Sequence, residues 1–163
     1  MKNSKQQPEN QAVTILLVED DKGHAELVRL NLRRGGITNE IVHFENGQKA
    51  LDFLLRNKID EKKYLMILDI NMPGINGLQV LSKIKGHDAT KNIPIIILTT
   101  ATDEREAEYC YELGCNVFIT KPVDYETFCT AIQELGNFLK IAKFSGSKKG
   151  GTGTEQDQYV VYY

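Results

Sequence analysis

The chain has 163 residues, of which 41% are hydrophobic and 26% charged, a composition typical of a folded globular protein. Its net charge of -2 at pH 7 gives no general attraction to nucleic acid, so we expect no nucleic-acid partner. No apolar run approaches the ~20 residues that cross a bilayer, and we expect no membrane association. The polar start lacks a hydrophobic signal core, and the three cysteines do not cluster with histidine. These features predict a cytoplasmic protein with reduced thiols.

Composition divides the chain into three parts. Residues 1–11 are polar and aperiodic, which predicts a flexible leader. Residues 12–143 carry the periodic apolar patterns of one folded domain. Residues 144–163 form a Gly/Ser-rich tail with an apolar end at Tyr159–Tyr163. Two interpretations of that end stay open, a solvated tail or a strand that pairs with an exposed sheet edge.

Five short apolar runs predict five strands, at residues 13–18, 40–44, 64–68, 94–98 and 116–120. A segment with helical spacing follows each run. In the first of these the apolar positions are Ala25, Leu27, Val28, Leu30 and Leu32. Regular alternation of strand and helix favours a parallel sheet covered on both faces, an α/β doubly wound fold.

The third run ends at a carboxylate, Asp69, in the stretch LDINMPGINGL. Pro73, Gly74 and Gly77 then stop the strand and lead into a helix. Open α/β sheets bind their ligands at the carboxyl ends of the strands. Asp69 is therefore a candidate reactive group.

Other strands end in side chains suited to the same chemistry. Glu19 and Asp20 follow the first run, Thr99 ends the fourth, and Lys121 follows the fifth. Clustered carboxylates repel one another, and a divalent cation among them lowers that cost. Oxygen ligands without histidine or cysteine select a hard ion, Mg²⁺ with Mn²⁺ as the alternative.

A lysine and a hydroxyl beside Asp69 could stabilise phosphoryl oxygens while Asp69 acts as the nucleophile. The simpler interpretation is that each carboxylate caps the helix that follows it. We prefer capping for Asp21 alone. For the whole set capping is insufficient, because it does not account for Lys121.

Four motifs, LLVEDD, LDINMPGINGL, IILTTA and FITKP, occur in an order that resembles the receiver domain of two-component response regulators. The resemblance covers about residues 13–143 and makes 12–143 the receiver domain. It implies a flavodoxin-like fold of five parallel strands in the order 2-1-3-4-5 with five helices. It also implies that Asp69 is the phospho-acceptor, and that Glu19, Asp20, Asp69 and the backbone carbonyl of Asn71 hold the metal.

The same resemblance assigns further roles near the carboxyl edge of the sheet. Thr99 would be the switch hydroxyl, Phe118 the switch aromatic, and Lys121 the phosphate-binding lysine, with a cis bond to Pro122. For Phe118 a plain core role stays open, because it occupies an alternating strand position. Such a protein is no enzyme in the usual sense but a phospho-acceptor switch that assists its own phosphorylation and dephosphorylation.

A finer pattern, including HAELVRLNLRRGGI and KPVDYETF, resembles single-domain regulators paired with bacterial and cyanobacterial phytochrome kinases. The implied partner is a histidine kinase of the phytochrome type. The tail lacks a basic recognition pattern, so we expect output through protein contacts. Our preferred contact is a homodimer through the face formed by the fourth helix, the fifth strand and the fifth helix.

Two other classes of protein remain in view. One is a phosphatase or dehalogenase with a strand-end aspartate. Those enzymes commonly carry a second aspartate two residues after the nucleophile, where this chain has Asn71. The other is a binding module on the same fold that works without phosphorylation.

Overall fold

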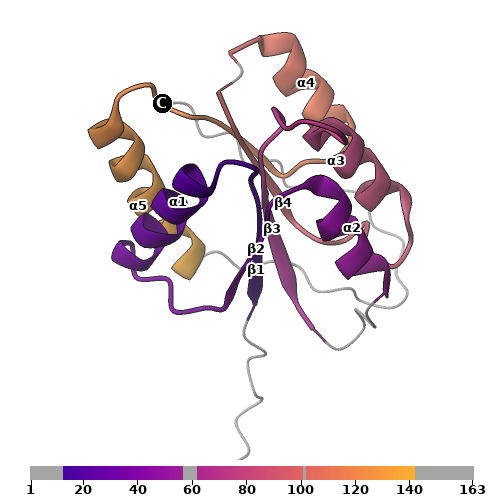
Figure 1. Ribbon diagram of the computed structural model, residues 1–163, viewed down its shortest axis with the longest axis horizontal. Helices are drawn as coiled ribbons and strands as arrows, with labels where there is room; N and C mark the ends of the chain where they lie inside the picture. The colour runs from indigo at the N-terminus through magenta and orange to yellow at the C-terminus, as the bar shows by residue number, and fades with distance from the viewer. Residues whose placement is uncertain (1–12, 57–61, 101, 142–163) are drawn as a thin grey trace, which may run out of the picture.

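A computed structural model describes residues 13–56, 62–100 and 102–141 (Figure 1). Strands and helices alternate along the described chain, as the apolar runs predict. The elements are β1 (Thr14–Val18), α1 (Lys22–Arg34), β2 (Ile41–Phe44), α2 (Gly47–Arg56), β3 (Tyr64–Leu68), α3 (Gly77–Gly86), β4 (Ile95–Thr99), α4 (Glu104–Glu112), β5 (Val117–Thr120) and α5 (Tyr125–Ile141).

All strand pairs are parallel, and the sheet order is β2-β1-β3-β4-β5, which confirms the predicted topology. Val18 at the end of β1 lies in register with Phe44 of β2 and Leu68 of β3. On the other side, Thr99 of β4 pairs with Thr120 of β5. The strands therefore end along one edge, and the residues that follow them are brought together.

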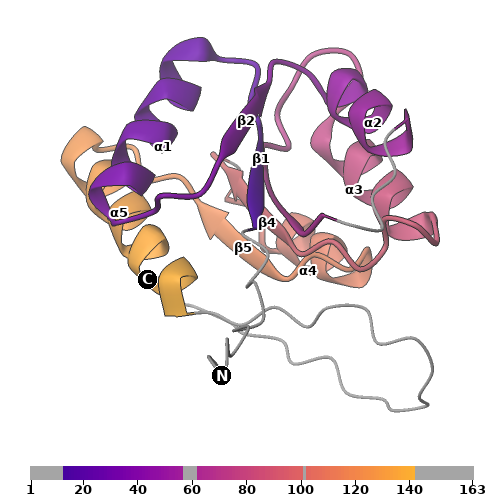
Figure 2. The same cartoon turned by 90° about the horizontal axis from the view of Figure 1, so that it is seen from below.

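Two helical layers enclose the sheet, with α1 and α5 on one face and α2, α3 and α4 on the other (Figure 2). Met66 and Leu68 of β3 belong to the core under α2, α3 and α4, whereas Leu65 and Ile67 belong to the core under α1 and α5. Both faces of β3 are buried, which explains why its sequence is apolar without alternation.

Helices α1 and α5 pack closely because glycine occupies their crossing. A Cβ at Gly35 would overlap the Gln133 carbonyl oxygen. Within this contact the fully buried Asn31 donates from Nδ2 to the Leu27 carbonyl at 2.9 Å. Its Oδ1 accepts from Gln133 Nε2 at 3.0 Å. These contacts fix α1, whose first turn adjoins the acidic residues after β1.

Several details differ from the sequence expectations. Leu30 is 41% exposed and so does not belong to the buried face of α1. The Lys121–Pro122 bond is trans, as are all peptide bonds in the described ranges, so the cis expectation is wrong here. Trans is the intrinsic preference by about 0.5–1 kcal/mol, and the Lys121 N–H donates to the Thr99 carbonyl at 2.6 Å in this arrangement.

Other expectations concern the helix ends, the thiols and the termini. Asp21 caps α1 as predicted, its side chain accepting from the His24 N–H at 2.8 Å. The three cysteines are free and buried. None of the helices in the described ranges is long and apolar enough to cross a membrane. The predicted leader at 1–11 and the tail at 144–163 lie outside the described residues.

Candidate functional site

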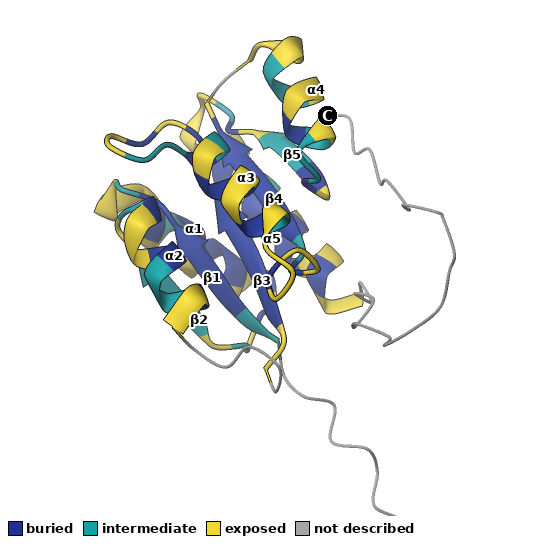
Figure 3. Ribbon diagram, turned by 90° about the vertical axis from the view of Figure 1, so that its right-hand side faces the viewer, coloured by how far each residue is buried: buried dark blue, intermediate teal, exposed yellow. Residues whose placement is uncertain are grey.

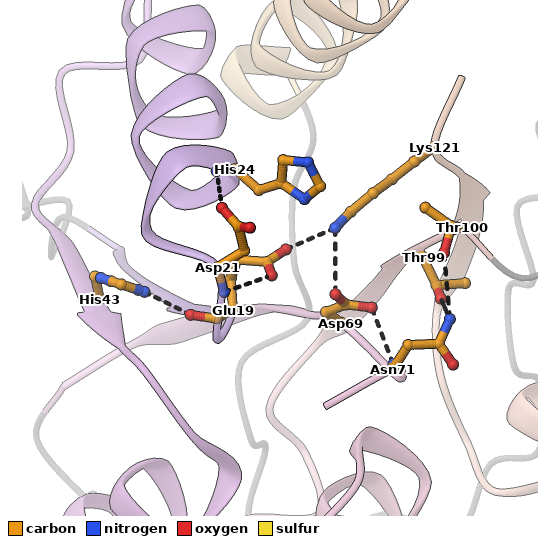
Figure 4. Close-up of polar contacts among 9 residues, drawn as sticks. All are labelled: Glu19, Asp21, His24, His43, Asp69, Asn71, Thr99, Thr100 and Lys121. Carbon is orange, nitrogen blue, oxygen red and sulfur yellow. Dashed lines mark hydrogen bonds and ion pairs between the residues drawn. The ribbon is translucent and has the colours of Figure 1, made fainter. Parts of the chain in front are cut away.

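The carboxyl edge of the sheet gathers side chains from the ends of four strands (Figure 4). Lys121, which follows β5, points between the carboxylates that follow β1 and β3. Its Nζ lies 2.6 Å from Glu19 Oε2 and 3.2 Å from Asp69 Oδ2. One ammonium group therefore bridges two carboxylates that are far apart in sequence.

This bridge lies almost entirely inside the protein. Glu19 is 2% exposed, Lys121 6% and Asp69 7%. Burial raises the pKa of Glu19 above its ordinary value, and the Lys121 ammonium acts in the opposite direction. A buried carboxylate without a cation is costly, so the Lys121 ammonium offsets part of the cost of burying these two side chains.

Three carboxylates form a group whose composition suits a metal ion. Glu19, Asp20 and Asp69 each offer one oxygen, and these oxygens lie within 4.8 Å of one another. Asp20 is partly exposed, which leaves the group open to solvent on one side. A set of oxygen donors without histidine or sulfur fits a hard divalent cation.

The loop after β3 holds Asp69 through tight backbone packing. A Cβ at Gly77 would overlap the Asp69 carbonyl oxygen and the Ile70 Cα, so only glycine fits. The Gly77 N–H donates to the Ile70 carbonyl at 3.0 Å. Asn76 caps α3 in a reciprocal capping box with Gln79. The loop is thereby fixed between β3 and the first turn of α3.

Asn71 connects this loop to β4. Its backbone N–H donates to Asp69 Oδ1 at 3.1 Å. Its side-chain Nδ2 donates to Thr99 Oγ1 at 3.2 Å and to Thr100 Oγ1 at 3.3 Å. Thr99 ends β4 at the predicted edge, and its side chain is fully buried. The role of the Asn71 carbonyl as a metal ligand stays a prediction.

Phe118 lies in β5, where its half-buried side chain packs against the core under α2, α3 and α4. Its backbone N–H donates to the hydroxyl of Tyr111 in α4 at 3.1 Å. This placement suits a core aromatic and a switch aromatic equally, so the switch role also stays a prediction.

The sequence analysis did not foresee the contact that His43 makes with this site. His43 Nε2 lies 2.7 Å from the backbone carbonyl oxygen of Glu19. Because a carbonyl only accepts, His43 is the donor and carries a proton on Nε2. The contact depends on the pairing of β1 with β2, where His43 lies opposite Leu17. No local sequence motif indicates this contact between His43 and Glu19.

A doubly wound sheet with a carboxylate group, a buried lysine and a hydroxyl at its carboxyl edge defines a class of signalling domains. A family model described as the response regulator receiver domain matches residues 15–133, and the chain belongs to this family.

Similar proteins include other response regulators, one of them described as a phytochrome response regulator. A response regulator receiver domain from Rhodospirillum rubrum is 42% identical, with a TM-score of 0.77, covering 81% of this chain and 96% of that one. Response regulator Rcp1 of Synechocystis is 33% identical over 132 residues, which is 79% of this chain and 90% of Rcp1. The phosphorylated cyanobacterial phytochrome response regulator RcpA is 27% identical, with a TM-score of 0.74, covering 83% and 99% of the two chains.

Proposed function

We propose that this protein is a response regulator of the single-domain type that accepts a phosphoryl group from a histidine kinase on Asp69. The observation that carries the proposal is the buried Lys121 ammonium, 3.2 Å from Asp69 Oδ2, beside the carboxylate group. The protein would act as a switch that assists its own phosphorylation and dephosphorylation. It would not be an enzyme that turns over a separate substrate.

In the proposed reaction an oxygen of Asp69 attacks phosphorus in line with the phosphohistidine nitrogen. The P–N bond breaks, an O–P bond forms, and the kinase histidine leaves with the electron pair of the broken bond. Lys121 already faces Asp69 and would stabilise the phosphoryl oxygens as charge builds on them. Burial keeps Lys121 and Asp69 oriented before the donor arrives.

The metal of this site would be Mg²⁺, with Mn²⁺ as the alternative. Glu19, Asp20 and Asp69 would hold it together with the backbone carbonyl of Asn71. The bound ion supplies neutralisation of phosphoryl charge. Two observations support the assignment. The donor set contains only oxygen, and one solved structure of the relative Rcp1 is its Mn²⁺-bound form.

Thr99 would respond to the phosphoryl group by moving its hydroxyl onto it, with Phe118 turning inward afterwards. The surface that changes is the face of α4, β5 and α5, and we propose that it forms a homodimer. Apolar side chains are exposed on the two helices of this face. Tyr109 is 49% exposed, Phe138 37% and Ile141 78%. Burial of such groups favours association.

We propose a phytochrome-type histidine kinase as the donor and the cytoplasm as the site of action. Support for the kinase class comes from relatives such as RcpA, described as a phytochrome response regulator. The overall composition supports the compartment.

Intact-protein mass after incubation with acetyl phosphate and Mg²⁺ tests the proposal. Wild-type protein should gain one phosphoryl group, and the gain should disappear when a chelator precedes the donor. Asp69→Asn should gain none. No adduct on the wild-type protein with any small-molecule donor or histidine kinase would instead favour a binding module that works without phosphorylation.

A further inference from the structure

We propose that the hydroxyl of Tyr111 couples helix α4 to the switch strand β5, so that a change at Phe118 reaches the surface of α4. This inference rests on the proposed function and adds a positioning residue to it. The bond that carries it runs from the Phe118 backbone N–H to Tyr111 Oη, 3.1 Å long and partly buried.

The position of β5 in the sheet explains why this bond exists. β5 is the last strand, next to β4 alone, and Phe118 lies in register with Ile97. Alternate backbone N–H groups of an edge strand face away from the sheet and need another partner. A side chain from α4 provides one, at the residue proposed to turn during switching.

Helix α4 has few other anchors. Cys110 is its buried residue, while Glu104, Arg105 and Glu108 are exposed. Much of the α4 ribbon is coloured as exposed (Figure 3). An element with little buried apolar surface shifts at low free-energy cost. The hydrogen bond between the Tyr111 hydroxyl and Phe118 can therefore determine how far α4 moves when β5 moves.

The rings of Tyr111 and Phe118 also share an apolar environment. Both pack against the core under α2, α3 and α4. An inward turn of Phe118 would alter the core against which the Tyr111 ring also packs, while the hydroxyl keeps the helix attached to the strand backbone. The two contacts together make α4 sensitive to the Phe118 rotamer.

The same helix offers a matched control. Tyr109 lies two residues earlier and is 49% exposed. Tyr111→Phe and Tyr109→Phe each remove one phenolic oxygen. In Tyr111→Phe this oxygen is the one bonded to β5, and in Tyr109→Phe it lies on the surface. A difference between the two variants then reports on the bond and not on the loss of a phenol.

The first measurement tests the bond itself in the full chain without ligand. Amide hydrogen exchange at Phe118 should be about fivefold faster in Tyr111→Phe than in the wild-type protein, the effect of losing one hydrogen bond. Tyr109→Phe should exchange at the wild-type rate. Equal exchange in all three proteins would overturn the proposal.

The second measurement tests the coupling by backbone amide NMR, with beryllofluoride and Mg²⁺ as the phosphoryl analogue. In the wild-type protein and Tyr109→Phe, amides near Asp69 and amides of α4 should both shift. In Tyr111→Phe the shift near Asp69 should persist, while the α4 shifts should fall at least twofold. If the α4 shifts in Tyr111→Phe are as large as those in the wild-type protein, the proposed coupling is overturned and the proposed function is unaffected. No response near Asp69 in any protein would overturn the proposed function and the coupling with it.

Discussion

Lys121 Nζ lies 3.2 Å from Asp69 Oδ2 and bridges to Glu19 Oε2 at 2.6 Å. The Lys121 ammonium group thus contacts both the proposed phospho-acceptor, Asp69, and a proposed metal ligand, Glu19. A phosphoryl group on Asp69 would bring oxygens to an ammonium group that is already in place, with little rearrangement of β5. Preorganised charge of this kind is the largest contribution in many phosphoryl-transfer sites.

The glycine at the start of α3 should be necessary for the shape of the loop that holds Asp69. Gly77→Ala should lower the free energy of unfolding by about 1–3 kcal/mol, because the added methyl group overlaps the Asp69 carbonyl and Ile70. Urea denaturation measures this loss. Gly86→Ala is the matched control at the other end of α3. No atom lies within 4 Å of its added Cβ, so stability should stay equal or rise. Equal effects of the two substitutions would contradict the packing argument.

The hydrogen bond from His43 to the Glu19 carbonyl should orient the peptide that leads into Asp20. His43→Leu should raise the dissociation constant for Mn²⁺ by about fivefold, the equivalent of one hydrogen bond of about 1 kcal/mol. Isothermal titration at fixed pH measures it. His43→Gln keeps an N–H donor and should recover most of the affinity. Wild-type affinity in His43→Leu would show that the bond has no bearing on the metal site.

Asn71 should oppose the movement proposed for the Thr99 hydroxyl. Its Nδ2 donates to Thr99 Oγ1 at 3.2 Å, and that bond must break if Thr99 turns toward a phosphoryl group. Asn71→Ala removes the bond and should tighten binding of beryllofluoride by about two- to tenfold, corresponding to about 0.5–1.5 kcal/mol. The proposed metal ligand at this position is the backbone carbonyl, which the substitution retains. Weaker binding at saturating Mg²⁺ would contradict a restraining role.

Lys85 should make stability depend on pH in the alkaline range. Burial lowers the pKa of Lys85 to about 8, and its Nζ donates to the carbonyls of Lys91 and Ile93. Between pH 8 and 10 the unfolded chain keeps a proton that the folded chain has lost, so stability should rise with pH. The neutral amine still has two N–H groups for the two carbonyls.

Urea denaturation of wild-type protein and Lys85→Met at pH 7, 8 and 9 measures this effect. The free energy of unfolding of the wild-type protein should rise relative to that of Lys85→Met above pH 8. The slope should stay below the limit of about 1.4 kcal/mol per pH unit, because only part of the folded population has lost the Lys85 proton at these pH values. If the difference in free energy of unfolding between the wild-type protein and Lys85→Met is the same at pH 7, 8 and 9, the predicted titration of Lys85 is excluded.

The alternation of strands and helices was enough to predict a parallel sheet, and the strand ends were enough to predict that the site residues converge at one edge. The strand order came from the resemblance to receiver domains. The apolar run Tyr64–Leu68 predicts a strand buried on both faces, and parallel pairing then places Asp69 beside Glu19 and Lys121. No side-chain geometry is needed for that step.

Contacts that depend on orientation across elements could not be predicted. The bond from His43 to Glu19 requires the β1–β2 register, and the bond from Phe118 to Tyr111 requires the placement of α4 against an edge strand. Exposure of Leu30 depends on how α1 rotates against α5. The trans Lys121–Pro122 bond involves too small an energy difference for sequence to decide.

The most direct test of the central claim is to locate the phosphoryl group. Wild-type protein is treated with acetyl phosphate and Mg²⁺, reduced with borohydride, which converts an acyl phosphate to an alcohol, and mapped by peptide mass spectrometry. We predict homoserine at position 69 and at no other aspartate, with none in a sample that received chelator before the donor. Conversion of another carboxylate, or efficient modification of Asp69→Asn, would contradict the account.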